Sequence, residues 1–370
     1  MKVGIPSEIK NNEFRVGITP AGVKDLVTNG HEVQVQVGAG LGSGIPDEAY
    51  VAQGAKMIPT AEEVWKSSEM IIKVKEPIAK EYDLLQDGQL LFTYLHLAAD
   101  KPQTEALLSH NVTSIAYETV LGPNNSLPLL APMSEIAGRL APQVGSHFLL
   151  KANGGSGVLL GGGSGVRRGK VVVLGGGVAG FFAARVANGM GGDVTVFDVN
   201  PKRMQYIDEV TLGQVRTLFS SALAVEEAVA EADLVVGAVL IPGAAAPKLV
   251  TNEMVKNMKP GSVLVDIAID QGGCFEDSHA TTHDDPVFKV HNSTIYAVAN
   301  MPGAVPYTST YALTNATMRY AVALANKGWK EACKSVPGLI DGLATHGGKL
   351  YSPPVGEALG IDAVAPQEAL

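Results

Sequence analysis

The chain has 370 residues, 46% of them hydrophobic, which is enough to bury a large core and fits two domains more readily than one. Its formal net charge of -9 offers no cationic surface to a polyanion, so nucleic acid and anionic membrane surfaces are poor candidate partners. Small molecules are the expected partners instead.

The first 118 residues repeat one pattern, in which a short apolar run precedes a helix-like segment. Strands are predicted over 2–5, 32–37, 70–74, 90–95 and 113–117, and helices over 21–28, 61–67 and 101–109. Pro20 and Pro102 suit the first turn of a helix, where no backbone N–H is needed. This alternation predicts a parallel sheet with crossover helices.

The same pattern resumes near residue 170 and indicates a second α/β unit. Its strands are predicted over 171–174, 195–197, 234–239, 263–267 and 295–298. The segment 134–152 has apolar positions typical of a helix and is predicted to cross from one unit to the other. A long helix over 310–326 then follows the second unit, so we expect the chain to return to the first.

A glycine-rich segment, 154–165, precedes the second unit and is compatible with a flexible linker or with an ordered loop. It is not a phosphate-binding P-loop, because Gly169-Lys170 is followed by Val171 and not by Ser or Thr.

Cysteine usage and the N-terminal sequence bear on the compartment. Cys274 and Cys333 are too few and too far apart for a disulfide framework or a Cys-x-x-Cys motif. No charged leader with an apolar region opens the sequence, and no run reaches the roughly 18 apolar residues of a membrane span. We therefore expect a soluble, cytoplasmic protein.

The strongest chemical signal is the sequence Gly-Gly-Gly-Val-Ala-Gly at 175–180, which follows an apolar strand and leads into a helix. Gly175 permits the tight turn, Gly177 lets the backbone approach a pyrophosphate, and Gly180 lets the helix pack closely on the strand. The N-terminus of that helix would face phosphate with unpaired N–H groups. The alternative is a strand-to-helix turn without a ligand, but the context favours a dinucleotide site.

Asp198 ends the next strand-like run, about 20 residues after the glycine turn, where a carboxylate accepts hydrogen bonds from an adenosine ribose. The same charge repels a 2'-phosphate, which favours NAD over NADP. Lys202 and Arg203 follow closely and leave NADP open as the alternative, with Arg203 better placed near the adenosine.

Three polar residues of the first unit follow predicted strands, where parallel α/β sheets collect their ligands. Lys75 could grip a carboxylate or polarise a carbonyl oxygen, and His96 could carry protons near neutral pH. Glu118 is as readily a structural hydrogen-bonding or surface group. Arg15, in a polar loop after the first strand, could bind a carboxylate through two hydrogen bonds.

In the second unit, Asp270 follows the predicted strand 263–267, where it could orient water or stabilise an iminium cation. Asp266 is the competing acid, and neither spacing nor composition selects between them. The remaining histidines lack the spacing of metal ligands, so no metal site is expected.

With these residues in place, the sequence resembles the alanine dehydrogenase family over nearly its whole length. The matching segments are 1–8, 13–20, 72–77, 94–96, 132–135, 173–180, 266–274, 299–306 and 308–317, whereas the tail after about residue 352 matches loosely. The resemblance implies an α/β fold of two Rossmann-like domains with parallel sheets, joined by long helices. A substrate domain split into 1–128 and 307–370 would flank an inserted NAD-binding domain at 129–306.

The resemblance also implies roles for individual residues. Arg15 and Lys75 would hold the carboxylate and oxygen of the substrate, His96 would be the acid/base, and Asp270 would activate water. The implied cofactor contacts, besides Gly175, Gly177, Gly180 and Asp270, are Ser134, Val178, Ala179, Asp198, Arg203, Ser220, Val239, Leu240, Ile267, Val298, Asn300 and Met301. A homohexamer with a cleft that closes on substrate is implied as well.

The implied reaction is the NAD-dependent oxidation of L-alanine to pyruvate and ammonium, and its reverse. The rival readings are the nucleotide-binding subunit of a proton-translocating transhydrogenase and an NAD-sensing regulatory protein, neither of which explains His96 together with Asp270. Other small amino acids or glyoxylate remain alternative substrates. Tyr94, Met133 and Met301 are candidates for limiting the side chain to a methyl group.

Overall fold

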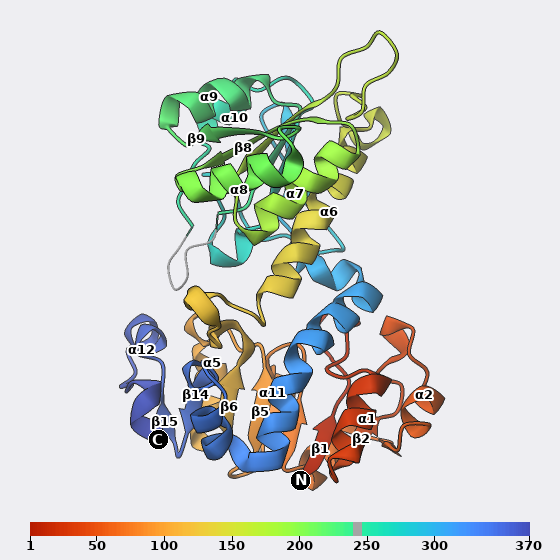
Figure 1. Cartoon of the computed structure of the whole chain (residues 1–370), viewed down its shortest axis with the longest axis vertical. Coiled ribbons are helices and arrows are strands. Elements are labelled where there is room, and N and C mark those ends of the chain that lie inside the picture. The colour runs from red at the N-terminus through yellow and green to blue at the C-terminus, as the bar shows by residue number, and fades with distance from the viewer. Residues whose placement is uncertain (240–245) are drawn as a thin grey trace. The chain divides into compact units, whose positions relative to one another are not determined.

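The computed structural model describes residues 1–239 and 246–370. It divides into two compact units (Figure 1). Unit 1 comprises Met1–Pro132 and Val305–Leu370, and unit 2 comprises Met133–Ala304. Each unit is built around one sheet.

Unit 1 contains an eight-stranded sheet in the order β15-β14-β6-β5-β4-β1-β2-β3. The strands are β1 (Lys2–Ile5), β2 (Glu32–Gln36), β3 (Lys56–Ile58), β4 (Met70–Ile72), β5 (Leu90–Thr93), β6 (Thr113–Ala116), β14 (Leu343–His346) and β15 (Lys349–Leu350). Strands β1 to β6 pair in parallel, whereas β14 pairs antiparallel with β6 and β15. The C-terminal segment thus extends the sheet that the N-terminus begins.

Helices connect and cover these strands. They are α1 (Pro20–Thr28), α2 (Asp47–Val51), α3 (Ala61–Ser67), α4 (Ala79–Tyr82), α5 (Lys101–Ser109), α11 (Pro306–Ser335) and α12 (Pro353–Leu359). Thr19 caps α1 and Asp100 caps α5, each through its side-chain oxygen, and Pro20 and Pro102 lie in the first turns. Helix α11 crosses in front of the sheet and packs against α1 (Figure 1).

Unit 2 contains a seven-stranded sheet in the order β12-β13-β11-β10-β7-β8-β9. The strands are β7 (Lys170–Leu174), β8 (Asp193–Asp198), β9 (Arg216–Phe219), β10 (Leu234–Gly237), β11 (Val263–Asp266), β12 (Val287–Val290) and β13 (Ser293–Tyr296). All neighbours pair in parallel except β12 and β13. The helices are α6 (Ala131–Leu149), whose first residues precede the unit, α7 (Val178–Gly189), α8 (Pro201–Thr211), α9 (Ala222–Glu231) and α10 (Asn252–Lys256).

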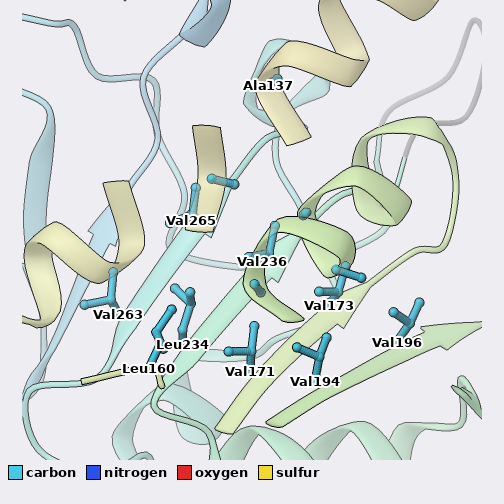
Figure 2. Packing of buried hydrophobic residues seen from close by; sticks show 14 of the residues in the cluster. Ala137, Leu160, Val171, Val173, Val194, Val196, Leu234, Val236, Val263 and Val265 are labelled. Carbon is cyan, nitrogen blue, oxygen red and sulfur yellow. The ribbon is translucent and has the colours of Figure 1, made fainter. Parts of the chain in front are cut away.

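Alternate residues of the central strands of unit 2 supply two separate cores, because successive side chains of a strand point to opposite faces. Val171, Val173, Leu234 and Val236 point into one cluster with Ala137 of α6 (Figure 2). The intervening residues, with Val172 and Val235 among them, pack into a second cluster on the other face. Near-continuous apolar strands of this kind are typical of parallel sheets buried on both faces.

The predicted α/β class with two mostly parallel sheets is confirmed. The polar helix α8, the edge strand β9 and the strands β12, β14 and β15 with antiparallel pairing were not predicted from the sequence. The flexible-linker interpretation of 154–165 is wrong: Leu160 is 2% exposed, and the amide of Gly169 donates to its carbonyl oxygen at 2.9 Å. Among the described residues, no helix is long and apolar enough to cross a membrane, and no group of acids, histidines or cysteines is arranged to hold a metal.

Candidate active site

Unit 1 places Arg15, Lys75 and His96 beyond the carboxyl ends of β1, β4 and β5, three strands that are neighbours in the sheet. The side chain of Lys75 is 12% exposed, and its Nζ lies 3.9 Å from Glu76 Oε2. Its carbonyl oxygen accepts a hydrogen bond from Thr93 Oγ1 at 3.0 Å, which ties the end of β4 to the end of β5. The two strand ends are therefore fixed to each other where the candidate residues emerge.

Arg15 is 2% exposed and is clamped by Glu13. Its Nε donates to Glu13 Oε1 at 2.7 Å and its Nη2 donates to Glu13 Oε2 at 2.5 Å. Burial alone would lower the pKa of Arg15, but the hydrogen bond and charge of Glu13 outweigh it, so the pKa is raised. The guanidinium is thus held as a cation in one orientation.

A buried ion triad supports the segment that leads to Lys75. Lys73, which is 1% exposed, donates to Glu8 Oε2 at 3.0 Å and to Glu81 Oε1 at 2.9 Å. The other oxygen of Glu8 accepts from the amide of Val74 at 2.7 Å. Burial lowers the pKa of Lys73, yet the two carboxylates outweigh it and the pKa is raised, which keeps the ammonium charged.

His96 has a left-handed backbone, with φ 50°, an unusual conformation for a residue other than glycine. Glu118 stabilises it, because Glu118 Oε1 accepts from the amide of His96 at 2.6 Å. The imidazole stacks on Tyr94 with ring centroids 5.8 Å apart, and its Nδ1 lies 4.0 Å from Glu118 Oε1. The His96 side chain is 42% exposed, so it is accessible to solvent or a ligand while its backbone is held.

In unit 2, the glycine turn has the close packing that the sequence predicts. Gly175 has φ +95°, and a Cβ on Gly180 would lie 1.8 Å from the Gly175 carbonyl oxygen. A Cβ on Gly177, by contrast, would meet no described heavy atom within 4 Å, and no described side chain caps α7. Val178 and Ala179 form the first turn of that helix. The open helix N-terminus therefore fits a pyrophosphate.

Asp198 ends β8 and is bonded to the backbone around the turn. Its Oδ2 accepts from the amide of Gly176 at 2.7 Å, and its Oδ1 accepts from the amide of Asn200 at 2.8 Å. Arg203 Nε donates to the Gly176 carbonyl oxygen, and its guanidinium lies 5.0 Å from the Phe181 ring. Burial lowers the pKa of Arg203. Lys202, in contrast, is exposed.

Three of the other predicted cofactor contacts follow strands of the same sheet. Ser220, Val239 and Ile267 follow the carboxyl ends of β9, β10 and β11, and Ser134 lies in α6. Val298 and Met301 have side chains in the hydrophobic core. Asn300 has φ 69°, and Leu240 lies outside the described residues.

The structure separates the two candidate acids after β11. Asp266 is completely buried and accepts from the amides of Ala268 and Cys274 at 3.1 and 2.9 Å and from Ser278 Oγ at 2.5 Å. Asp270 is exposed in a short 3₁₀ turn, Ile269–Gln271. Asp266 is therefore structural, and Asp270 is the acid accessible to a ligand.

The acids that hold the candidate site, Glu8, Glu13 and Glu81, were not predicted from the sequence, and the role of Glu118 was left open. One signal was available: Lys73 interrupts the apolar run 70–74, and a buried lysine requires acidic partners. The sequence does not say which acids these are, because Glu8 is 65 residues away.

Two family models match the chain: "Alanine dehydrogenase/PNT, N-terminal domain" over residues 4–137 and "Alanine dehydrogenase/PNT, C-terminal domain" over residues 141–353. An alanine dehydrogenase of Mycolicibacterium smegmatis is 60% identical over 361 residues, which is 98% of this chain and 97% of the relative. One from Staphylococcus haemolyticus is 55% identical over 371 residues, covering 100% and 99%.

Solved structures agree. A structure described as L-alanine dehydrogenase superposes with a TM-score of 0.94 at 51% identity, covering 97% of this chain and 99% of the other. A transhydrogenase from Sinorhizobium meliloti superposes with a TM-score of 0.80 at 28% identity, covering 95% and 99%. Both chains are matched over almost their full length.

Proposed function

The chain belongs to the alanine dehydrogenase/PNT family, and we propose that it interconverts L-alanine with pyruvate and ammonium, using NAD as the hydride carrier. The observation that carries the proposal is the set of Arg15, Lys75 and His96 at the carboxyl ends of neighbouring strands in unit 1. Two cations and an imidazole at one sheet edge suit a small oxo acid that must be bound and protonated.

Arg15 and Lys75 would bind the substrate. A guanidinium is suited to a carboxylate because its planar donors match the two oxygens, and the Glu13 clamp limits the rotamers that binding must select. Lys75 Nζ would donate to the carbonyl oxygen and stabilise the negative charge that develops on it.

His96 would move the proton at that oxygen as the carbinolamine forms and collapses. NAD supplies the acceptor for the hydride from the alanine Cα when it is bound. Glu118 holds the His96 backbone, and the Tyr94 ring stacks on one face of the imidazole. Asp270 would orient the attacking water, or ammonia in the reverse direction.

The preference for NAD over NADP would come from Asp198, whose carboxylate disfavours a second phosphate on the ribose. A homohexameric state and a cytoplasmic location also belong to the proposal and are supported by the family alone. Light scattering of the purified protein tests the assembly.

The transhydrogenase subunit is the second candidate and is less well supported. Its solved relative is 28% identical, against 51% for the L-alanine dehydrogenase structure. An exposed imidazole with a fixed backbone has no task in a subunit that only binds nucleotide.

The deciding experiment follows NADH oxidation by the purified protein with pyruvate and ammonium together, with each alone, and with glyoxylate or 2-oxobutyrate in place of pyruvate. We expect turnover that requires both components and is fastest with pyruvate. Absence of ammonium-dependent turnover would refute the proposed function, and faster turnover with glyoxylate would refute the assigned substrate.

A further inference from the structure

Two charged side chains that have no role in the proposed reaction, Asp266 and Lys248, form hydrogen bonds to the backbone of the turn that contains Asp270. We propose that Asp266 and Lys248 are positioning residues that hold residues 268–275 in place, so that Asp270 is presented to water or ammonia in a fixed direction. This inference rests on the proposed function and adds two residues to the machinery of that site.

Asp266, the buried last residue of β11, holds the turn through hydrogen bonds to its backbone. Its Oδ1 accepts from the amide of Ala268, and its Oδ2 accepts from the amides of Cys274 and Phe275 at 2.9 and 3.4 Å and from Ser278 Oγ. These donors lie on both sides of Asp270. One buried carboxylate thus closes the turn at its beginning and its end.

Lys248 holds the turn through its carbonyl groups. Its Nζ donates to the Gly272 carbonyl oxygen at 2.5 Å and to the Phe275 carbonyl oxygen at 2.9 Å. Asp266 accepts hydrogen bonds from backbone N–H groups of the turn, and Lys248 donates hydrogen bonds to its backbone carbonyl groups. Hydrogen bonds to charged groups are stronger than those between neutral groups, which suits a short irregular segment.

The backbone next to Lys248 adds a second support. The amide of Ala246 donates to the Gln271 carbonyl oxygen at 2.9 Å, and the amide of Leu249 donates to the Cys274 carbonyl oxygen at 2.8 Å. At Gly273 the turn lies close to Asp266, because a Cβ there would be 2.6 Å from Asp266 Oδ2, whereas a Cβ on Gly272 would meet no described heavy atom within 4 Å. The backbone is therefore held closely at Gly273, while Asp270 itself is exposed.

The same unit supplies matched controls at the opposite ends of its strands. Asp233, 2% exposed, precedes β10 and accepts from the amide of Lys170 at 2.8 Å. Lys259 Nζ donates to the Glu231 carbonyl oxygen and to Asp233 Oδ1. This acid and this lysine also bind backbone groups, but none that lies in the 268–275 turn.

Hydrogen exchange tests the positioning directly and does not depend on activity. Asp266→Asn and Lys248→Met should each speed exchange of the amides in 268–278, because each loses bonds to the turn. Asp233→Asn and Lys259→Met should leave that segment as in the wild type. Unchanged exchange in both Asp266→Asn and Lys248→Met would overturn the proposal, whatever the activity. Ser278→Ala, which removes one bond, replaces Asp266→Asn if the latter does not fold.

Kinetics then test whether positioning matters for the reaction. A displacement of about 1 Å costs roughly 100-fold in rate, so we expect kcat to fall by about 10- to 100-fold in Asp266→Asn and less in Lys248→Met. The KM for ammonium should rise while the KM for pyruvate and the Kd for NADH stay within about threefold. Wild-type kinetics, or losses equal to those of the two control variants, would overturn the catalytic role.

The outcomes separate this inference from the proposed function. If the wild-type protein turns over no pyruvate and ammonium, the proposed function fails and the catalytic half of this inference falls with it. The structural half still stands or falls on the exchange data alone. If the wild-type protein is active, the exchange and kinetic results decide both halves.

Discussion

The two candidate ligand regions use charge in different ways. In unit 1, Arg15 and Lys73 are almost fully buried and are paired with carboxylates: Arg15 with Glu13, two residues away, and Lys73 with Glu8, 65 residues away. In unit 2, the glycine turn offers open backbone, and Asp198 is bonded to amides around it. A three-carbon acid has little surface to recognise and requires fixed ionic groups, whereas a pyrophosphate is well matched by a helix N-terminus.

This contrast has an energetic consequence. Charges buried in pairs are costly when one partner is removed, whereas exposed pairs contribute little. Substitutions of the buried charges in unit 1 should therefore affect stability and substrate turnover. Substitutions around the glycine turn at 175–180 in unit 2 should affect nucleotide selection.

His96→Ala should separate the two regions most clearly. General acid/base groups contribute about 10²- to 10⁴-fold in rate, so pyruvate-dependent NADH oxidation should fall by about 10³-fold. NADH binding, measured by fluorescence titration, should stay within about twofold of the wild type because His96 belongs to unit 1. Unchanged turnover in this variant would refute the role assigned to His96.

Glu13→Gln tests the buried pair of unit 1. Removing one member of a buried ion pair costs about 3–5 kcal/mol, so we expect a loss near 3 kcal/mol in the free energy of unfolding from urea titration. Lys256→Met is the comparison, because Lys256 and its partner Glu253 are 57% and 67% exposed and their pair should be worth no more than about 1 kcal/mol. Equal losses in the two variants would contradict the division between buried and exposed pairs.

Asp198→Gly tests nucleotide selection. It removes the charge that disfavours a 2'-phosphate, so the ratio of kcat/KM for NAD to that for NADP should fall by about tenfold, or about 1.4 kcal/mol. The KM for pyruvate should change little, because the residues proposed to bind pyruvate, Arg15 and Lys75, lie in unit 1. An unaltered cofactor ratio would count against the ribose contact.

The substitution Asp233→Asn should have the smallest effect, a change in the free energy of unfolding that depends on pH. Burial would raise the pKa of Asp233, but hydrogen bonds from Arg167 and the Lys170 amide outweigh it and the pKa is lowered. A lowered carboxyl pKa stabilises the fold above the unfolded value near 4 and loses that contribution as pH falls through the folded value. Because Arg167 is 52% exposed, screening keeps the contribution below about 1 kcal/mol.

The corresponding measurement is the unfolding free energy of wild type and Asp233→Asn between pH 6 and the acid limit of folding. We expect the difference between them to shrink as pH falls. A difference that stays constant, or that grows toward acid pH, would contradict the lowered pKa.

Local patterns carried the sequence prediction of unit 2. The apolar run of β7, the glycines at 175–180 and Asp198 at the end of β8 all lie within about one βαβ unit, so their spacing reports their geometry. The choice between Asp266 and Asp270 could not be made this way. It depends on burial, which differs completely between two acids four residues apart.

The charged pairs that support the candidate site of unit 1 could not be predicted from the sequence for a different reason. Glu8 and Lys73 meet because β1 and β4 are neighbours in the sheet, and strand order is not encoded in any local period. Likewise, β14 carries no signal that it pairs antiparallel with β6, 227 residues or more earlier in the chain. Strand β9 was not predicted because three of its four residues are exposed, so no buried face marks it as a strand.

The most direct test of the division between the two units is a titration of Arg15→Lys with NADH and then with pyruvate, followed by calorimetry. Lysine keeps the charge beside Glu13 but lacks the planar donors of arginine. We predict that NADH binds with wild-type affinity and that pyruvate binding to the NADH complex weakens by at least about tenfold. Loss of NADH binding, or wild-type pyruvate affinity, would contradict the assignment of pyruvate binding to Arg15 of unit 1.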